Sequence, residues 1–110
     1  MNENVKEYLP LTEATYYILI SLIKPLHGYG IMQNVEDISK GEVTLGPGTL
    51  YGALNKLEKK GLIMKAENTE DSRRKNYVIT EFGKLVIIEE YKRLNELIKC
   101  SKNIIKSIGG

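Results

Sequence analysis

The sequence of 110 residues predicts a mainly helical α+β fold, in which three helices precede a two-stranded hairpin and a long helix closes the chain. Apolar residues repeat at helical spacing in several segments, two extended runs flank one polar loop, and proline or glycine stands at most boundaries between segments. The length suits one domain rather than two, and 42% hydrophobic residues is ordinary for a soluble protein.

The first predicted helix covers roughly Thr12 to Lys24. Thr12 suits the N-cap, because its hydroxyl can accept a hydrogen bond from a first-turn N–H, and Pro25 stops the helix. Apolar residues lie on most sides of this helix. We therefore expect it to be buried more completely than packing of one face against a small domain requires.

Two further helices are predicted at roughly Gly28–Lys40 and Pro47–Lys60, with a short extended piece between them. Each has one apolar stripe at spacings of three and four residues, and each is followed by a glycine suited to the left-handed conformation at a helix end. Pro47 costs little in the first turn, because the N–H that proline lacks would be unpaired there anyway. The stripes consist of Ile31, Val35 and Ile38 in the second helix and Leu50, Leu54 and Leu57 in the third.

A hairpin is predicted next, with strands at Leu62–Glu67 and Asn76–Thr80 on either side of the polar sequence NTEDSRRK. This loop ends in three adjacent basic residues, Arg73, Arg74 and Lys75. Since neighbouring residues of an extended chain point to opposite sides, these side chains can contact different parts of one partner at the same time. A solvated loop that binds nothing remains the alternative.

The last predicted helix begins after Thr80, which suits an N-cap, and nothing in the sequence stops it before Gly109. From Glu81 to Ile108 it would be about 42 Å long at ~1.5 Å per residue. A folded domain of ~100 residues has a radius of gyration of only ~13 Å. The length therefore favours packing across a subunit interface over packing on the helix's own domain. Apolar residues step by four and three in a heptad seam with one polar interruption, formed by Ile87, Tyr91, Leu94, Ile98, Ser101, Ile105 and Ile108.

The order of three helices and a hairpin is that of a winged helix-turn-helix, whose third helix enters the major groove of DNA. The surface of the third helix opposite its leucines has small residues near the N-terminus and basic residues near the C-terminus. Small residues let a helix backbone approach DNA closely, although Gly52 costs the helix up to ~1 kcal/mol relative to alanine. An exposed face that binds nothing is the alternative. This outward surface consists of Thr49, Gly52, Ala53, Asn55, Lys56, Lys59 and Lys60.

Charge is unevenly distributed, with a net charge of −3 over residues 1–55, +3 over residues 56–80 and +2 over residues 81–110. The basic balance begins within the third helix, as expected of a surface that binds a polyanion. Ordinary solvated faces can show the same charges, so charge alone does not decide between the two interpretations.

Other function classes find little support. His27 and Cys100 are the single residues of their kinds, and a zinc site would need further ligands, so a packing or capping role for His27 is the better interpretation. The glycines from Gly46 to Gly52 follow no buried strand and lack the GK[ST] of a nucleotide-binding loop. We therefore expect no enzymatic activity, no cofactor and no bound metal ion. No apolar run approaches the ~20 residues of a membrane span and no signal pattern begins the chain, which indicates a cytoplasmic protein.

Two stretches, LGPGTLYGALNKLEKKGLI and RRKNYVITEFG, resemble the PadR family of bacterial transcription regulators. HGYGI, which begins at His27, is similar to the family's approach to its second helix, and the resemblance covers roughly residues 11–108. The chain departs from the family pattern at Asn76, where a second tyrosine is common, and at Ile79, where leucine is usual. The single C-terminal helix is similar to that of the smaller PadR subfamily.

The resemblance implies a homodimeric transcriptional repressor that binds double-stranded DNA. Residues 1–80 would form the DNA-binding winged helix-turn-helix, and residues 81–110 would form the dimerisation helix. The two parts would make one compact unit. Many family members respond to phenolic compounds or cationic drugs near the dimer interface, which implies a small aromatic or cationic effector. Tyr16, Tyr17 and Tyr91 could line such a pocket, although core packing is the better interpretation. A winged-helix module that dimerises and docks a protein without binding DNA is the alternative function.

Two sets of site residues follow. We expect DNA contacts from Gly48, Thr49, Tyr51, Gly52, Asn55, Lys56, Arg73, Arg74, Lys75 and Tyr77. We expect a dimer interface that includes Tyr16, Ile87, Tyr91, Leu94, Ile98 and Ile105. For the two tyrosines of the first set, Tyr51 and Tyr77, packing is an alternative to DNA contact.

Overall fold

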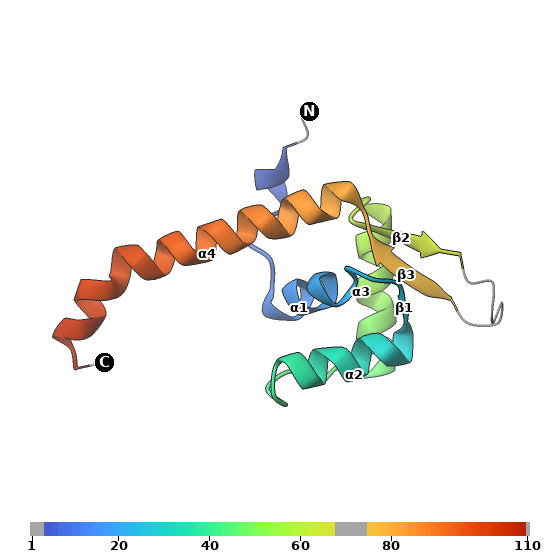
Figure 1. The fold of residues 1–110 in the computed structure, drawn as a ribbon, viewed down its shortest axis with the longest axis horizontal. Helices are drawn as coiled ribbons and strands as arrows, with labels where there is room; N and C mark the ends of the chain where they lie inside the picture. Colours follow the sequence, from blue (N-terminus) through green and yellow to red (C-terminus); the bar gives the residue numbers. More distant parts are fainter. Residues whose placement is uncertain (1–3, 68–74, 110) are drawn as a thin grey trace.

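Helices dominate the structure, a computed structural model that describes residues 4–67 and 75–109. In chain order the elements are η1 (Val5–Tyr8), α1 (Glu13–Ser21), β1 (Leu26–His27), α2 (Gly28–Ile38), α3 (Pro47–Lys59), β2 (Ile63–Ala66), β3 (Asn76–Ile79) and α4 (Glu81–Ser107). Figure 1 shows α1, α2, α3 and the small sheet gathered on one side, while α4 runs across them and projects beyond. The predicted mainly helical winged helix-turn-helix is therefore confirmed, with one additional strand, β1, and one short 3-10 helix, η1.

Side chains cap three of the helices at their N-termini. The hydroxyl oxygen of Thr12 accepts a hydrogen bond from the N–H of Thr15 (3.1 Å), and the hydroxyl oxygen of Thr80 accepts one from Gly83 (2.9 Å). Both predicted caps are confirmed. His27 caps α2, since its Nδ1 accepts a hydrogen bond from the N–H of Gly30 at 3.1 Å. The single histidine therefore has the capping role that the sequence favoured.

The first helix is shorter than predicted. It ends at Ser21 rather than near Lys24, and the N–H of Leu22 closes its last turn on the carbonyl of Leu19. Two constraints explain the early end. The chain must extend before Pro25, because proline disfavours the helical conformation in the residue before it. It must then supply β1, which pairs with β3.

The sheet has the order β1-β3-β2, and both pairings are antiparallel. Leu26 pairs with Tyr77 in one ladder, and Ile63 pairs with Ile79 in the other. The hairpin strands match the two predicted runs. Because β1 leads directly into α2, its pairing with β3 fixes the start of α2 beside the base of the hairpin.

The core lies where the helices meet the sheet. The leucine stripe of α3 is buried throughout, as predicted, and so are Ile31 and Val35 of α2. Ile38 departs from the prediction, since 43% of its surface is exposed where the last turn of α2 runs past the core. The buried apolar residues are Ile18, Leu19, Leu22, Ile31, Val35, Leu45, Leu50, Leu54, Leu57, Leu62, Ile63, Tyr77, Ile79 and Val86.

Three glycines outside α3, at positions 41, 61 and 83, are required by the fold. Gly41 and Gly61 have φ angles of +83° and +78°, so the predicted left-handed helix ends are confirmed. Gly83 is buried in the first turn of α4, where a Cβ would collide with the carbonyl oxygen of Leu62. Its lack of a side chain lets α4 start against the connection between α3 and β2.

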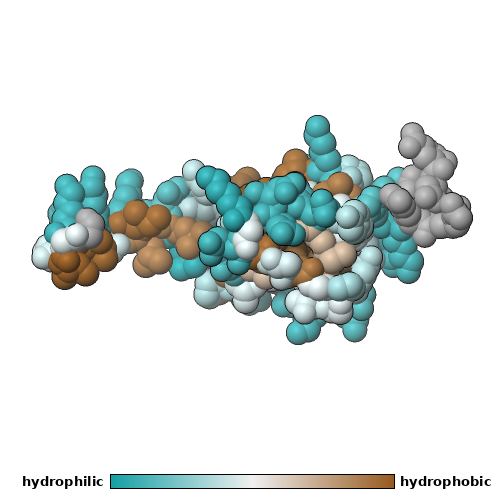
Figure 2. Space-filling model, turned by 90° about the horizontal axis from the view of Figure 1, so that it is seen from below, coloured by the Kyte–Doolittle hydropathy of each residue, from teal (hydrophilic) through white to brown (hydrophobic). Residues whose placement is uncertain are grey.

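The two halves of α4 have different surroundings. Gly83, Val86 and Glu90 are buried against the domain, whereas Ile98 and Ile104 are about two-thirds exposed, at 65% and 66%. Figure 2 shows hydrophobic side chains gathered along the projecting end. None of the helices in the described part of the chain is long and apolar enough to cross a membrane.

A buried carboxylate joins α4 to the segment before α1. Glu90, whose side chain is 2% exposed, accepts a hydrogen bond from the N–H of Leu11 (3.0 Å) and two from the guanidinium of Arg93 (2.7 and 2.9 Å). The hydrogen bonds from Arg93 lower the pKa of the Glu90 carboxyl, and the Leu11 N–H acts in the same direction, while burial opposes them. The charged carboxylate therefore holds the N-terminal segment in place.

Glu90→Gln is expected to lower the free energy of unfolding by about 1–3 kcal/mol near neutral pH, because the amide cannot accept all three hydrogen bonds. Arg93 is 39% exposed, so water moderates the loss. A lowered folded-state pKa means that the charged carboxylate stabilises the fold fully above its ordinary pKa of about 4.3, and that this contribution is lost as pH falls through the lower folded-state value.

Urea unfolding at equal protein concentration checks this expectation. The difference between wild type and Glu90→Gln should be constant from about pH 6 to pH 8 and shrink below about pH 4. Glu89→Gln is the matched control, because Glu89 forms an exposed ion pair with Lys92 at 3.5 Å and should matter little. An undiminished Glu90→Gln difference near pH 3 would contradict the role of the charge.

Candidate nucleic-acid interface

The outward surface of α3 is open at its N-terminal half. Gly48, Thr49, Gly52 and Asn55 are exposed, on the side of the helix opposite its buried leucines. A Cβ added at Gly46, Gly48 or Gly52 would meet no atom within 4 Å. No neighbour among the described residues therefore requires glycine at these three positions, in contrast to Gly83.

The first turn of α3 leaves backbone donors open. Gly46 is the N-cap and supplies no side-chain acceptor, and Pro47 occupies the first turn. Amide N–H groups at an uncapped helix start, together with the helix dipole, favour an anion. Lys56 and Lys59 are exposed at the other end of the helix, so positive charge and small residues share one face.

Tyr51 lies on one flank of this surface, and its side chain packs against the start of α2. It is 44% exposed, and a Cβ at Gly28 would collide with its hydroxyl group. Gly28 therefore gives Tyr51 room at the start of α2. The ring packs at this junction and keeps part of its surface open, so packing and contact with a ligand are compatible for this residue.

Tyr77 has a different environment. It is 5% exposed and belongs to the core, which agrees with the packing alternative that the sequence left open. Burial raises the pKa of the Tyr77 hydroxyl, Glu58 adds to the shift, and Lys65 opposes it. Lys75 is exposed at the start of β3, whereas the predicted contacts Arg73 and Arg74 lie outside the described residues.

A groove of about 470 Å³ lies along the other flank of α3. One wall comes from the N-terminal segment and the first turn of α1, through Tyr8, Pro10, Leu11, Thr12 and Thr15. The other wall comes from α3 and the start of the hairpin, through Gly48, Thr49, Gly52, Ala53, Lys56, Leu57, Lys60 and Leu62. The sequence prediction missed the first wall, since residues 8–11 show no periodicity that would assign them to a site.

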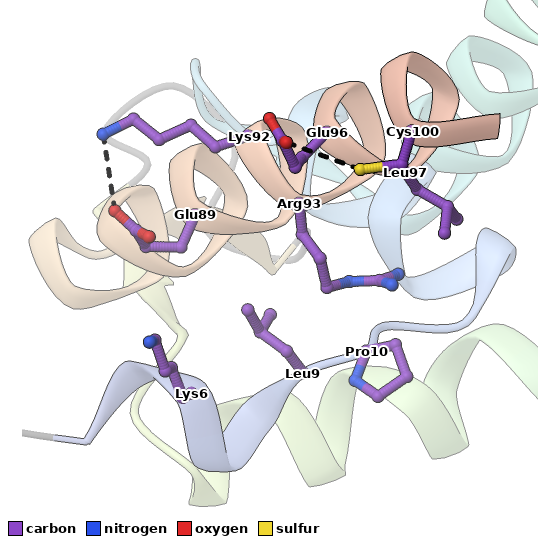
Figure 3. Close-up of a pocket in the computed structure, with 9 residues that line it drawn as sticks. All are labelled: Lys6, Leu9, Pro10, Glu89, Lys92, Arg93, Glu96, Leu97 and Cys100. Atoms are coloured by element: carbon purple, nitrogen blue, oxygen red, sulfur yellow. Dashed lines mark hydrogen bonds and ion pairs between the residues drawn. The ribbon is translucent and has the colours of Figure 1, made fainter. Parts of the chain in front are cut away.

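A second groove, of about 770 Å³, separates the N-terminal segment from α4 (Figure 3). Three of its lining residues are aliphatic, and five are charged, three of them basic and two acidic. Cys100 donates a hydrogen bond to Glu96 (3.5 Å), which raises the pKa of the thiol. The described residues contain no cluster of ligands that could hold a metal ion. The lining residues are Lys6, Leu9, Pro10, Glu89, Lys92, Arg93, Glu96, Leu97 and Cys100.

The residues expected at a dimer interface lie along α4 and beside it on α1. Tyr91, Ile98 and Ile105 are exposed, while Tyr16, Ile87 and Leu94 are half-buried. Burial raises the pKa of the Tyr16 hydroxyl, with further contributions from Tyr91 and Glu90. Tyr16, Tyr17 and Tyr91, for which core packing was the better interpretation than an effector pocket, belong to neither groove.

Comparison with known proteins identifies relatives that match most of the chain. The model of the transcriptional regulator PadR-like family matches residues 17–89. Transcriptional regulator Rv3488 of Mycobacterium tuberculosis is 32% identical over 75 residues, which cover 67% of this chain and 67% of that protein. The crystal structure of a PadR family transcription regulator from Clostridium difficile R20291 superposes with a TM-score of 0.70 at 26% identity, covering 86% of this chain and 99% of that one.

A longer relative shares part of the sequence. A 37.1 kDa protein in transposon TN4556 of Streptomyces fradiae is 41% identical over 79 residues, which cover 71% of this chain. The match spans only 22% of that protein, about a fifth of its length.

Proposed function

Because the chain belongs to the PadR-like family of transcriptional regulators, we propose that it is a homodimeric repressor that places α3 in the major groove of an inverted-repeat operator. The observation that carries this proposal is the outward surface of α3. Its glycines at 46, 48 and 52 are required by no neighbour in the described chain, and its exposed C-terminal end is basic. A helix backbone that approaches base edges closely needs such a surface.

The proposed DNA contacts are divided between α3 and the hairpin. Thr49 and Asn55 are exposed and can donate to phosphates or base edges, and Lys56 can reach a phosphate or a guanine. Arg73, Arg74 and Lys75 of the hairpin loop would hold the backbone or enter the minor groove. Each subunit would read one half-site, with half-sites about 34–36 Å apart or at a multiple of that spacing.

The homodimer is supported by the uncovered face of α4. The face that is buried at Val86 and Glu90 continues at helical spacing through Leu97, Ile104 and Ile108, which are exposed. No other element of the described chain covers this continuation. A second copy of α4 would bury these side chains and would set the distance between the two α3 helices.

A small aromatic or cationic effector would act by changing the pose of α4. The groove in Figure 3 is the best place for it, since Leu9, Pro10 and Leu97 supply apolar walls. The carboxylate of Glu96 lines the same groove and has no basic partner among the described residues, so it could hold a cationic group.

Salt dependence tests the proposed function. We expect the affinity for a duplex containing the operator, found by footprinting upstream of the protein's own gene, to fall by roughly 10³ or more between about 50 and 200 mM salt. This follows because neutralised phosphates release counterions. Fluorescence anisotropy at several salt concentrations measures the slope. An affinity that does not change with salt, or no affinity for any duplex, would instead favour a winged-helix module that docks a protein.

A further inference from the structure

The groove between α3 and the N-terminal segment has a one-sided charge. Lys56 and Lys60 line it, and no Asp or Glu does. Neither lysine forms an ion pair with a described residue. Lys56 lies in the last turn of α3, and Lys60, four positions later, is the C-cap of that helix. Two positive charges about one helical turn apart repel each other, and an anion between them relieves the repulsion. The lining is therefore suited to a negatively charged partner.

A hydroxyl group on the opposite wall has a proton to donate. Thr12 donates its hydroxyl proton to the hydroxyl oxygen of Thr15 at 2.9 Å, and also accepts the N–H of Thr15. The hydroxyl of Thr15 is thus oriented as an acceptor toward Thr12, and its own proton can go to an acceptor in the groove. Thr49 places another hydroxyl on the α3 wall.

This groove is continuous with the outward surface of α3, which is the proposed DNA-binding surface. Gly48, Thr49, Gly52 and Lys56 belong to both. Tyr51 and the junction with α2 lie on one flank of that surface, and the groove lies on the other. A helix in the major groove of B-DNA has a sugar–phosphate backbone on each side, across a width of about 12 Å.

We propose that the groove seats the DNA backbone on the flank of α3 away from Tyr51, with Lys60 and Thr15 as phosphate contacts. This inference rests on the proposed function and deepens it. The N-terminal segment and α1 then form a clamp on the DNA backbone, and this clamp fixes the register of α3 in the major groove. Phosphate contacts of this kind position a protein on DNA and act on all sequences alike.

The N-terminal wall is anchored well enough to serve as such a clamp. The N–H of Leu11 is hydrogen-bonded to the buried Glu90 at 3.0 Å, and Arg93 holds Glu90 in turn. In Figure 1 the segment before α1 lies beside α4. The wall therefore does not have to become ordered when DNA binds, which would otherwise cost affinity.

Two conservative variants test the clamp. Lys60→Gln removes the charge and keeps the length of the side chain, and we expect it to reduce the slope of log affinity against log salt by about 0.9. Thr15→Val removes the donor and keeps the shape, and we expect a loss of affinity of about 3- to 10-fold with little change in the slope. Both losses should be similar on the operator and on unrelated duplexes.

The matched control is Lys99→Gln, the same charge change at an exposed position on α4 outside both grooves. Its salt slope should equal that of wild type. If wild type binds with the expected salt dependence while Lys60→Gln and Thr15→Val match it in slope and affinity, the proposed clamp is wrong. The proposal that the outward surface of α3 contacts DNA is then unaffected. If wild type binds no duplex, both proposals fail together. Lys60 is exposed, so Lys60→Gln remains decisive even if Thr15→Val folds poorly.

Discussion

Gly52→Leu is expected to abolish specific DNA binding while leaving the fold intact. The new side chain would stand on the outward surface of α3, where a Cβ at Gly52 meets no atom within 4 Å, so the folded chain accommodates it. Leucine is also the better helix former, by somewhat less than the ~0.8–1.0 kcal/mol that separates glycine from alanine. The variant should therefore melt slightly higher than wild type. On DNA, the same side chain would push the helix backbone away from the base edges.

The expected loss is large, because specific binding exceeds non-specific binding by roughly 10³ or more. Anisotropy titrations of the operator duplex, with a thermal melt of each variant, measure both effects. Gly52→Ala should give a smaller loss of affinity, since it adds one methyl group. Wild-type affinity in Gly52→Leu would mean that α3 does not approach DNA at this position.

Gly83→Ala is the opposite control. There the added Cβ would collide with the carbonyl oxygen of Leu62, so stability should fall, whatever happens to DNA binding. The pair separates two reasons for a glycine in a helix. At Gly83 the reason lies within the chain, and at Gly52 we propose that it lies in the partner.

Features decided by local sequence were predictable. The leucine stripe of α3 is buried as its spacing indicates, and Thr12 and Thr80 cap the helices that follow them. Each of these features depends on residues within a few positions of each other. The outward surface of α3 could therefore be assigned before the fold was known, because it is the complement of a regular stripe.

Features that depend on distant residues were not predictable. β1 has only two residues, which is too short to show an alternating pattern, and it exists because β3 pairs with it some fifty positions later. The contact of Leu11 with Glu90 joins residues 79 positions apart, and no local pattern marks either of them for it. The wall opposite α3 depends on this contact, so the groove appears only when the chain is folded.

The heptad seam of α4 was predictable from local sequence, but its surroundings depend on contacts between distant residues. Heptad spacing predicted an apolar face on a helix longer than its domain, and the structure shows where the domain ends beneath it. The face through Val86 and Glu90 is buried, whereas on the seam itself Ile87 and Leu94 are half-buried and Tyr91 is exposed. Beyond Leu94 the apolar side chains of both faces are exposed. An apolar face left without cover on one copy is the surface that a second copy would need.

Ile98→Glu is expected to convert the proposed dimer into monomers. Ile98 is 65% exposed in the single chain, so a charge there costs the isolated fold little. In a symmetric dimer the substitution occurs twice, and each copy loses the burial of an isoleucine side chain, about 1.5–3 kcal/mol. The dimer dissociation constant should therefore rise by roughly 10² to 10⁴, before the cost of burying a carboxylate is counted.

Sedimentation or light scattering over a range of concentrations measures the change, and operator affinity should fall with it, because a monomer reads only one half-site. Asn103→Glu is the matched control. It introduces the same charge at an exposed position of the projecting end, on the side of α4 turned away from Ile98 and the apolar face. An Ile98→Glu protein that remains dimeric at the wild-type dissociation constant would move the interface off this face of α4. It would then leave the exposed isoleucines of the projecting end without a partner.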